Sequence, residues 1–287
     1  MLRIEQPFRN HNAGHLAFNP LASPGDADFG MLYVGVADGG SGGDPLDLSQ
    51  DPSSIFGKII RIDPLASDAD NGAYGIPSDN PFVGRSGVLP EIFVSGVRNP
   101  QRFGWDEANG NLFVADIGQN QIEELSLAWA GADLGWNNWE GSYGFISRQE
   151  LDMSAPRSDP DLSYPIVEYD HEDPILIGRA AITGVVAYLH DAIPQFSGRL
   201  LFADYPRGEI FHVSADDLPD GGEDEIRRVL LRDGSGAERT FLELIQAKNR
   251  EQGRDEATRT DIRFATGPDG RFFLLNKHDG VIRELVR

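Results

Sequence analysis

The sequence contains no cysteine, so disulfide bonds, zinc–thiolate sites and cysteine nucleophiles are excluded. Lysine is scarce: it occurs only at Lys58, Lys248 and Lys277, and arginine carries nearly all the positive charge. No apolar run approaches the roughly 20 residues that a membrane-spanning helix requires, so no membrane span is expected. The formal net charge of −21 argues against nucleic acid as a partner, because phosphate binding requires a clustered basic surface.

What the chain does contain is typical of a globular β-protein. Its 287 residues are 40% hydrophobic and include 33 Gly and 18 Pro, a content that suits many short strands joined by turns. An all-β chain of this length often forms one domain. The N-terminal residues have no apolar segment of the kind that a signal peptide carries.

Strand patterns recur along the chain in similar units. Each unit has an apolar strand, a turn that is often Asx-Gly, a strand of the form x-L-F/Y-V, and one further strand. The expected strands are 14–19, 31–37 and 57–62; 101–106, 111–116 and 123–128; 184–189, 198–203 and 209–213; and 260–266, 271–276 and 281–286. Units of about 50 to 80 residues predict an all-β propeller with about four blades, one partial propeller domain over residues 1–287. A β-sandwich, with similar strands and turns, is the alternative.

Helical periodicity is nearly absent. The best candidate is 240–252, where Phe241, Leu244 and Ile245 recur at helical spacing, and a weaker one follows Ser147. Three long segments, 39–56, 65–89 and 140–165, are expected to be ordered loops on the face that carries the functional site.

A histidine and an aspartate are expected at the same end of the first unit. His11 precedes the first strand and Asp38 follows the second, so antiparallel pairing would bring them together. A carboxylate beside an imidazole fixes its tautomer and stabilises the imidazolium, which is how a general base is built. The alternative is a histidine that caps a strand beside an Asx turn.

Two further segments carry candidate ligands for a charged group. Arg98-Asn99-Pro100 marks a strand end, and an arginine there can grip a carboxylate through two hydrogen bonds. Gly118 and Gln119 follow another strand, where a turn can direct carbonyl oxygens inward, and such oxygens are ligands for calcium. A solvated arginine and an ordinary turn are the alternatives.

Together these segments resemble the glucose/sorbosone dehydrogenase family, the soluble aldose sugar dehydrogenases that depend on pyrroloquinoline quinone (PQQ). The motifs His-x-x-Gly-x-Leu, Gly-x-x-Asp-Gly-Gly, Gly-Lys-Ile-x-Arg-Ile-Asp-Pro, Arg-Asn-Pro-x-Arg and Asp-x-Gly-Gln-Asn-x-x-Glu-Glu occur in the family's order. The resemblance is specific from residue 10 to about 141 and looser to the C-terminus. It implies a six-bladed propeller that uses PQQ and calcium to oxidise a sugar and passes electrons to an external acceptor.

The resemblance also implies roles for individual residues. His11 matches the general base, Asp38 its orienting carboxylate, and Arg98, with Asn99, matches residues that contact PQQ. The carbonyls of Gly118 and Gln119 match ligands of the active-site calcium, and Glu124 with the Leu134 carbonyl matches a second, structural calcium position. Arg207 and Lys277 are candidate cationic contacts to PQQ, where glucose-specific members carry a lysine and an Arg-x-Arg pair.

The sequence departs from the family at its start. The family's catalytic histidine lies on about the third blade, whereas here it is residue 11, so we expect a longer parent protein with two earlier blades and an export signal. The resemblance places that parent in the periplasm or outside the cell; a small complete propeller is the alternative. The lysine and the Arg-x-Arg pair of the glucose-specific members are not matched exactly in this sequence. A non-catalytic propeller that binds a protein or carbohydrate is therefore the second functional hypothesis. A calcium-dependent lactonase, which would need a carboxylate and asparagine cage, ranks last.

Overall fold

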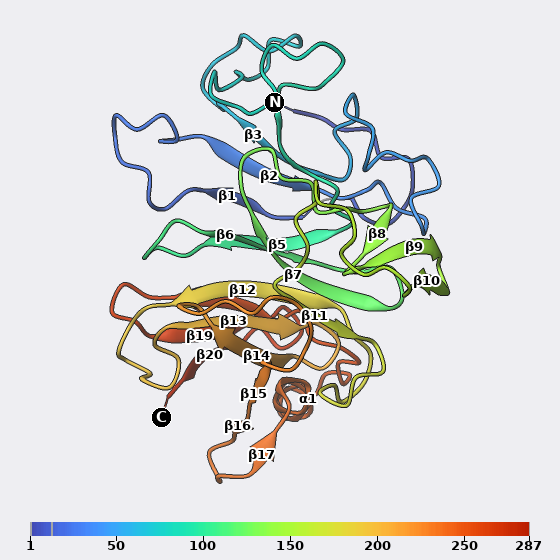
Figure 1. Cartoon of the computed structure of the whole chain (residues 1–287). Helices are drawn as coiled ribbons and strands as arrows, with labels where there is room; N and C mark the ends of the chain where they lie inside the picture. Colours follow the sequence, from blue (N-terminus) through green and yellow to red (C-terminus); the bar gives the residue numbers. More distant parts are fainter. Residues whose placement is uncertain (1, 13, 287) are drawn as a thin grey trace.

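Four principal antiparallel sheets follow one another along the chain (Figure 1). The computed structural model describes residues 2–12 and 14–286. The first sheet has the order β1 (Leu16–Phe18), β2 (Leu32–Val36), β3 (Lys58–Ile62), β4 (Ile92–Ser95). The second has the order β11 (Val167–Asp170), β7 (Ile122–Ala128), β6 (Leu112–Asp116), β5 (Pro100–Trp105). The third has the order β12 (Ile182–Tyr188), β13 (Arg199–Asp204), β14 (Glu209–Ser214), β15 (Arg227–Val229), and the fourth β18 (Arg263–Thr266), β19 (Phe272–Leu275), β20 (Ile282–Leu285).

Each principal sheet corresponds to one repeat unit of the sequence. All twelve expected strands are present in the expected order, and the structure adds β4, β11 and β15 as outer strands of the first three sheets. Smaller sheets occur as insertions: β8 (Trp139–Glu140), β9 (Tyr143–Ser147) and β10 (Glu150–Asp152), and β16 (Leu231–Arg232) with β17 (Glu238–Arg239).

The sheets pack face to face because their central strands are apolar on both sides. In β6, Leu112 and Val114 join Tyr33 and Phe103 in the core between the first two sheets. The alternate residues of the same strand enter the core between the second and third sheets. β13 repeats this arrangement between the third and fourth. A strand buried on both faces reads as a continuous apolar run, and this explains the x-L-F/Y-V pattern.

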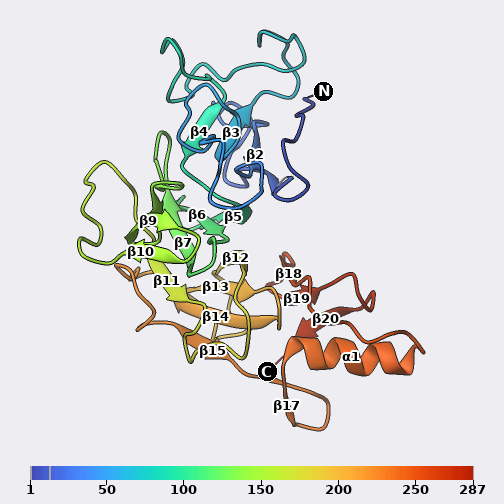
Figure 2. The same ribbon diagram turned by 90° about the vertical axis from the view of Figure 1, so that its right-hand side faces the viewer.

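The strand that starts each of the last three sheets lies nearest the middle of the molecule. β12 packs against both β5 and β18, and Figure 2 shows the three strands side by side at the inner edge of their sheets. Main-chain contacts join the same strand ends of neighbouring sheets: the Asp38 amide donates to the Arg98 carbonyl and the Thr260 amide to the Pro206 carbonyl. The loops at these ends therefore share one face of the molecule.

The helix expected over 240–252 is confirmed as α1 (Phe241–Glu251). Thr240 caps it by accepting from the Glu243 amide, and the Glu243 side chain accepts from the Thr240 amide, a reciprocal capping box. The second expected helix, after Ser147, is wrong: β9 and β10 form a hairpin there.

One of the three long loops is not on the expected face. The loop over 65–89 follows β3, which runs away from Asp38, and its Asp79 pairs with Arg61 Nη1 at 2.8 Å beside Asp28 of the β1–β2 connection. It thus lies at the opposite strand ends, whereas the loops over 39–56 and 140–165 lie at the Asp38 end and meet there, since Gly43 lies against Phe145.

Candidate functional site

His11 and Asp38 form a close pair at the shared face. His11 Nδ1 lies 2.6 Å from Asp38 Oδ1, and the Asp38 side chain is only 1% exposed. A carboxylate only accepts hydrogen bonds, so Nδ1 carries a proton; in the neutral imidazole, the lone pair is then on Nε2. Asp38 is itself held, because Gly40 N donates to Oδ1 at 2.9 Å and Trp136 Nε1 to Oδ2 at 3.1 Å. The expected juxtaposition of His11 and Asp38 is therefore present.

Arg98 and Asn99 are held against the same pair by their main chain. The Arg98 carbonyl accepts from the Asp38 amide at 2.8 Å. The amides of Arg98 and Asn99 donate to the two oxygens of Asp116 at 2.7 and 2.6 Å. Asp116 ends β6 and is fully buried, and burial raises its pKa to about 7. This carboxylate therefore sets the position of the Arg98–Asn99 segment.

The turn after β6 presents oxygen atoms to the Arg98 guanidinium. Arg98 Nη1 donates to the carbonyls of Ile117 at 2.8 Å and Gly118 at 2.5 Å, and Nη2 to Gln119 Oε1 at 3.3 Å. The guanidinium also lies over the Trp136 ring, 5.5 Å from its centre. Three oxygens thus converge on one cationic group, and carbonyl and amide oxygens are also the donors that calcium prefers.

Glu140 anchors this turn, and sequence reasoning missed it. Its Oε1 accepts from four consecutive amides, those of residues 119 to 122, at 2.9 to 3.1 Å. The side chain is fully buried. Gly118 is required beside it, because an added Cβ would lie 1.6 Å from the Ile122 carbonyl oxygen. With its amides turned toward Glu140, the turn directs its carbonyls toward Arg98. Glu140 sits in a two-residue strand within a long insertion, so no periodic signal marks it.

Glu124 and Leu134, the second expected calcium position, have separate partners. Glu124 Oε1 accepts from the Gly141 amide at 2.7 Å, while the Leu134 amide donates to the Ser95 carbonyl at 3.0 Å. Burial, and then the nearby Asp116 charge, raise the pKa of Glu124 well above its usual value. Within residues 2–12 and 14–286, no group of three or more Asp, Glu or His side chains is placed to hold a metal ion.

Arg207 and Lys277 lie at the same strand ends but outside this network. Arg207 is exposed on the β13–β14 turn, and its carbonyl accepts from the Leu242 amide. Lys277, on the β19–β20 turn, pairs with Asp261 Oδ2 at 2.5 Å and is 72% exposed. In the part of the chain that the structure describes, neither side chain bonds to His11, Asp38 or Arg98. The structure thus gathers the residues of the first two sheets and leaves these two apart.

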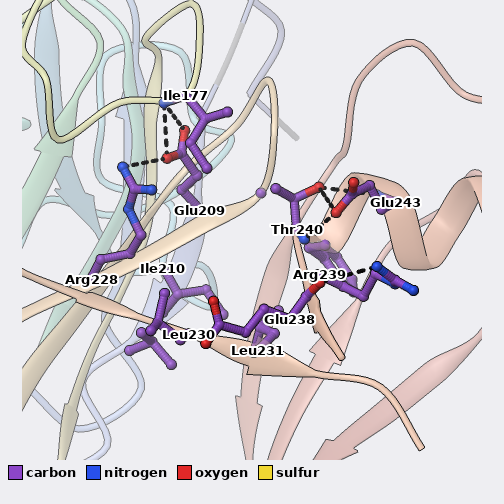
Figure 3. A pocket seen from close by; sticks show the side chains of 13 residues that line it. Ile177, Glu209, Ile210, Arg228, Leu230, Leu231, Glu238, Arg239, Thr240 and Glu243 are labelled. Atoms are coloured by element: carbon purple, nitrogen blue, oxygen red, sulfur yellow. Dashed lines mark hydrogen bonds and ion pairs between the residues drawn. The ribbon is translucent and has the colours of Figure 1, made fainter. Parts of the chain in front are cut away.

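A separate cavity of about 210 Å³ lies at the outer edge of the third sheet (Figure 3). One of its carboxylates, Glu209, is engaged by Arg228 Nη2 and the Ile177 amide, each at 3.1 Å. Thr240 and Glu243 of its lining form the helix cap, and Glu238 and Arg239 pair with Arg232 and Asp233. Its charged side chains therefore all have partners within the chain, and none of the expected site residues lines it.

Comparisons with known proteins support the family resemblance that the sequence motifs indicate. The family model described as "Glucose / Sorbosone dehydrogenase" matches residues 3–283. The HIPL1 protein of Arabidopsis thaliana is 34% identical over 208 residues, which are 69% of this chain and 29% of that protein. The chain therefore spans under a third of this relative.

Two solved structures share the architecture. A glucose dehydrogenase superposes with a TM-score of 0.62 at 21% identity, covering 97% of this chain and 64% of that one. The PQQ-bound form of an aldose sugar dehydrogenase from Streptomyces coelicolor gives 0.53 at 22% identity, covering 94% and 57%. The expected all-β propeller architecture is confirmed, and the four sheets are consistent with about four blades. None of the helices in the described residues is long and apolar enough to cross a membrane.

Proposed function

The chain belongs to the glucose/sorbosone dehydrogenase family, and from that premise we propose that it is a PQQ- and calcium-dependent oxidoreductase that oxidises the anomeric carbon of an aldose to a lactone. The observation that carries the proposal is the His11–Asp38 pair, with its 2.6 Å hydrogen bond and buried carboxylate, joined through one main-chain bond to the Arg98 segment.

His11 is assigned the role of general base. Its Nε2 takes the proton of the anomeric hydroxyl while hydride leaves the anomeric carbon, so that the sugar loses two electrons and two hydrogens and becomes the lactone. Asp38 stabilises the imidazolium formed and keeps Nε2 directed at the substrate. When bound, PQQ supplies the hydride acceptor and calcium the Lewis acid, and an external acceptor reoxidises the quinone.

The residues at the shared face offer atoms of the kinds that bind PQQ and calcium. The main-chain carbonyls of Gly118 and Gln119 are proposed calcium ligands, supported by the turn that Glu140 holds, in which the Gly118 carbonyl points toward the cationic Arg98 guanidinium. Arg98 and Asn99 are proposed PQQ contacts, and the Arg98 Nε has no hydrogen-bond partner within the described residues. Arg207 and Lys277 are proposed as further cationic contacts, and Glu124 with the Leu134 carbonyl as a second calcium position.

A non-catalytic propeller of the same family, binding a protein or carbohydrate, is the second candidate. The observation in its favour is that Lys277 is engaged by Asp261 and that Arg207 is exposed and apart from the His11 network. We propose a periplasmic or secreted location in either case, as the resemblance implies.

The test is to add PQQ and calcium to the purified chain with a dye acceptor and a panel of aldoses. We expect dye reduction that His11→Ala abolishes while PQQ binding, followed by its absorbance, persists. His190→Ala, far from the site, serves as the control. Dye reduction that survives His11→Ala contradicts the assigned base. PQQ binding without dye reduction in the folded wild-type chain favours the non-catalytic propeller.

A further inference from the structure

A cavity of about 400 Å³ lies between the first and second sheets, at the strand ends opposite to Asp38. Its walls include the β1–β2 connection, the loop over 65–89, the β5–β6 turn and the residues that follow β7. In Figure 1 the β1–β2 connection and the β5–β6 turn lie on one side of the molecule and the β8–β10 hairpin on the other. Small-ligand pockets have volumes of about 300 to 1,000 Å³. This cavity falls in that range, and none of the residues assigned to the base, PQQ or calcium lines it.

Contacts between the two sheets hold the walls of the cavity in place. A Cβ added to Gly110 would lie 3.8 Å from the side chain of Leu21, so the β5–β6 turn packs against the β1–β2 connection. A Cβ added to Gly131 would lie 3.4 Å from that of Pro81, so the segment after β7 packs against the loop over 65–89. The cavity is therefore a preformed part of the junction between the two sheets.

Four aromatic side chains line the cavity. Tyr33 packs edge to face against Trp105 and Phe93, with 4.9 and 5.0 Å between ring centres. Trp129 lines the cavity as well, but it is 55% exposed. Tryptophan is highly buried on average, and two of the four tryptophans of this chain line this one cavity. The Trp129 indole is therefore accessible to a ligand, while the other three rings support it from within.

The polar groups of the lining form one bonded set. Asp28 Oδ1 accepts from Arg61 Nε at 2.7 Å and from the Tyr33 hydroxyl at 2.9 Å, and Oδ2 accepts from Asn19 Nδ2 at 2.7 Å. Asp79 Oδ1 accepts from Arg61 Nη1 at 2.8 Å. Arg61 is buried, whereas Asp79 is accessible to solvent. These bonds fix the positions of the hydrogen-bonding groups that a ligand would meet.

The lining is unsuited to an ion. The face of Tyr33, which an aromatic cage would offer to a cation, is already taken by the Arg61 guanidinium, 5.9 Å from the ring centre. An anion would meet the carboxylates of Asp28 and Asp79. A neutral ligand with C–H faces and hydroxyl groups avoids both penalties. A pyranose has this character, because its C–H groups pack on the partly negative face of an indole and its hydroxyls bond carboxylates and amides.

We propose that this cavity binds a neutral pyranose unit of a carbohydrate chain, stacked on Trp129, with its hydroxyl groups bonded to Asn111 and Asp79. Asn111 lies on the β5–β6 turn, and its side chain lines the cavity beside Gly110. Gly110, Trp129 and Asp79 are all exposed, so the neighbouring units of a chain can extend into solvent. The site lies at the opposite strand ends from His11 and does not depend on the proposed oxidoreductase.

The test is calorimetric titration of the full chain, without PQQ, with cellotetraose and with maltotetraose. We expect at least one of them to bind, and Trp129→Ala to weaken that binding by about tenfold, because the stacking contact is lost. Trp129→Phe keeps an aromatic ring and should retain most of the affinity. Phe18→Ala is the matched control, since Phe18 is also 55% exposed but does not line the cavity. Binding of neither tetramer, or equal affinity in the wild type and Trp129→Ala, overturns the proposal.

Charged saccharides test the class of ligand. A glucosamine tetramer, which is cationic, and a galacturonate tetramer, which is anionic, should both bind more weakly than the neutral tetramer, because each meets a like charge in the lining. A charged tetramer that binds more tightly than both neutral ones contradicts the assigned class.

Two readouts separate this site from the His11 face. The neutral tetramer should change the tryptophan fluorescence of the wild type, and Trp129→Phe should bind it with a much smaller change. His11→Ala should bind the tetramer as the wild type does. If His11→Ala loses this binding and Trp129→Ala keeps it, the saccharide occupies the His11 face and the proposal is wrong. Absence of dye reduction in a wild type that binds the tetramer would contradict the proposed function and leave this site standing.

Discussion

Both carboxylate oxygens of Asp38 accept hydrogen bonds, and its partner His11 has an uncommon backbone conformation. His11 has φ of 57°, in the left-handed region that costs a non-glycine residue about 1 kcal/mol or more. In return its ring lies against a carboxylate that two other donors fix from Gly40 and Trp136. The pair is thus held from both sides, as a base of defined tautomer requires.

Replacing Asp38 with Asn should affect catalysis more than binding. An amide cannot stabilise the imidazolium, so we expect Asp38→Asn to lower kcat by roughly 100-fold or more, with PQQ affinity little changed. Steady-state dye reduction and PQQ titration measure the two effects. Asp70→Asn, at an exposed loop position, is the control, and a kcat of Asp38→Asn equal to that of this control would refute the assigned role.

His15 should make the stability of the chain dependent on pH. Its pKa is about 4 in the folded chain against an ordinary 6.5, because burial and the Arg102 and Arg263 charges disfavour the protonated ring. Between those values the unfolded chain binds a proton that the folded chain does not. Above pH 6.5 the His15 ring is neutral in both states and does not lower the unfolding free energy. As the pH falls from 6.5 toward 4, protonation of the unfolded chain lowers that free energy progressively.

Urea unfolding at pH 7 and pH 5 tests this. The fall in unfolding free energy between the two should be smaller in His15→Gln than in the wild type. The same change at His190, which packs on Tyr188 at 5.6 Å, should leave the fall unaltered. An identical fall in His15→Gln and wild type would show that the ring titrates normally.

At the scale of elements, the turn between β6 and β7 depends on a residue from a different element. Glu140 of β8 accepts four of its amides, so the inserted hairpin and the turn form one unit. Removing the carboxylate would leave several buried donors without a partner.

Glu140→Ala should lower the unfolding free energy by about 3 kcal/mol, and Glu140→Gln by about 1 kcal/mol, since the amide oxygen still accepts. Urea denaturation measures both, and Glu150→Ala on exposed β10 is the control. If calcium binds at the turn, its affinity should be lower in Glu140→Gln under conditions in which this variant is still folded. Calcium titration measures that affinity. A stability of Glu140→Ala equal to the control would contradict the anchor.

The sequence predicted elements that local pattern alone determines. The strands of the four sheets and α1 follow from apolar runs, Asx-Gly turns and the Thr240 cap, and the His11–Asp38 contact follows from antiparallel pairing. The hairpin after Ser147 was missed because its turn, Ser147 to Glu150, lacks Gly or Asn and reads as weakly helical. Glu140 was missed because a side chain that bonds distant main chain leaves no periodic trace. The loop over 65–89 lies at the opposite strand ends because it follows β3, which runs away from Asp38, and the composition of a loop does not indicate the strand end from which it leaves.

At the scale of the molecule, the first sheet has one covered and one partly open face. Its far face carries Leu16 and Phe18, which are 61% and 55% exposed. Leu16 also lines a cavity of about 560 Å³, together with Leu32, Val34 and Ile62. A contiguous exposed apolar face of this kind favours association.

Leu16→Ser combined with Phe18→Ser should therefore reduce concentration-dependent self-association of the chain, measured by sedimentation velocity at several concentrations. Leu65→Ser is the control, because Leu65 is 94% exposed but lies alone on a loop. If Leu65→Ser reduces self-association as much as the double variant does, the contact between chains does not lie at Leu16 and Phe18.

The serial packing of sheets has a consequence for how the chain opens. Each core is shared only by adjacent sheets, so stability is a chain of nearest-neighbour couplings, as in a linear repeat array. The two middle sheets have two coupled neighbours and the terminal ones a single such neighbour. Amide hydrogen exchange should accordingly be slowest in β6 and β13 and fastest in β1 and β20, so that unfolding proceeds inward from both ends.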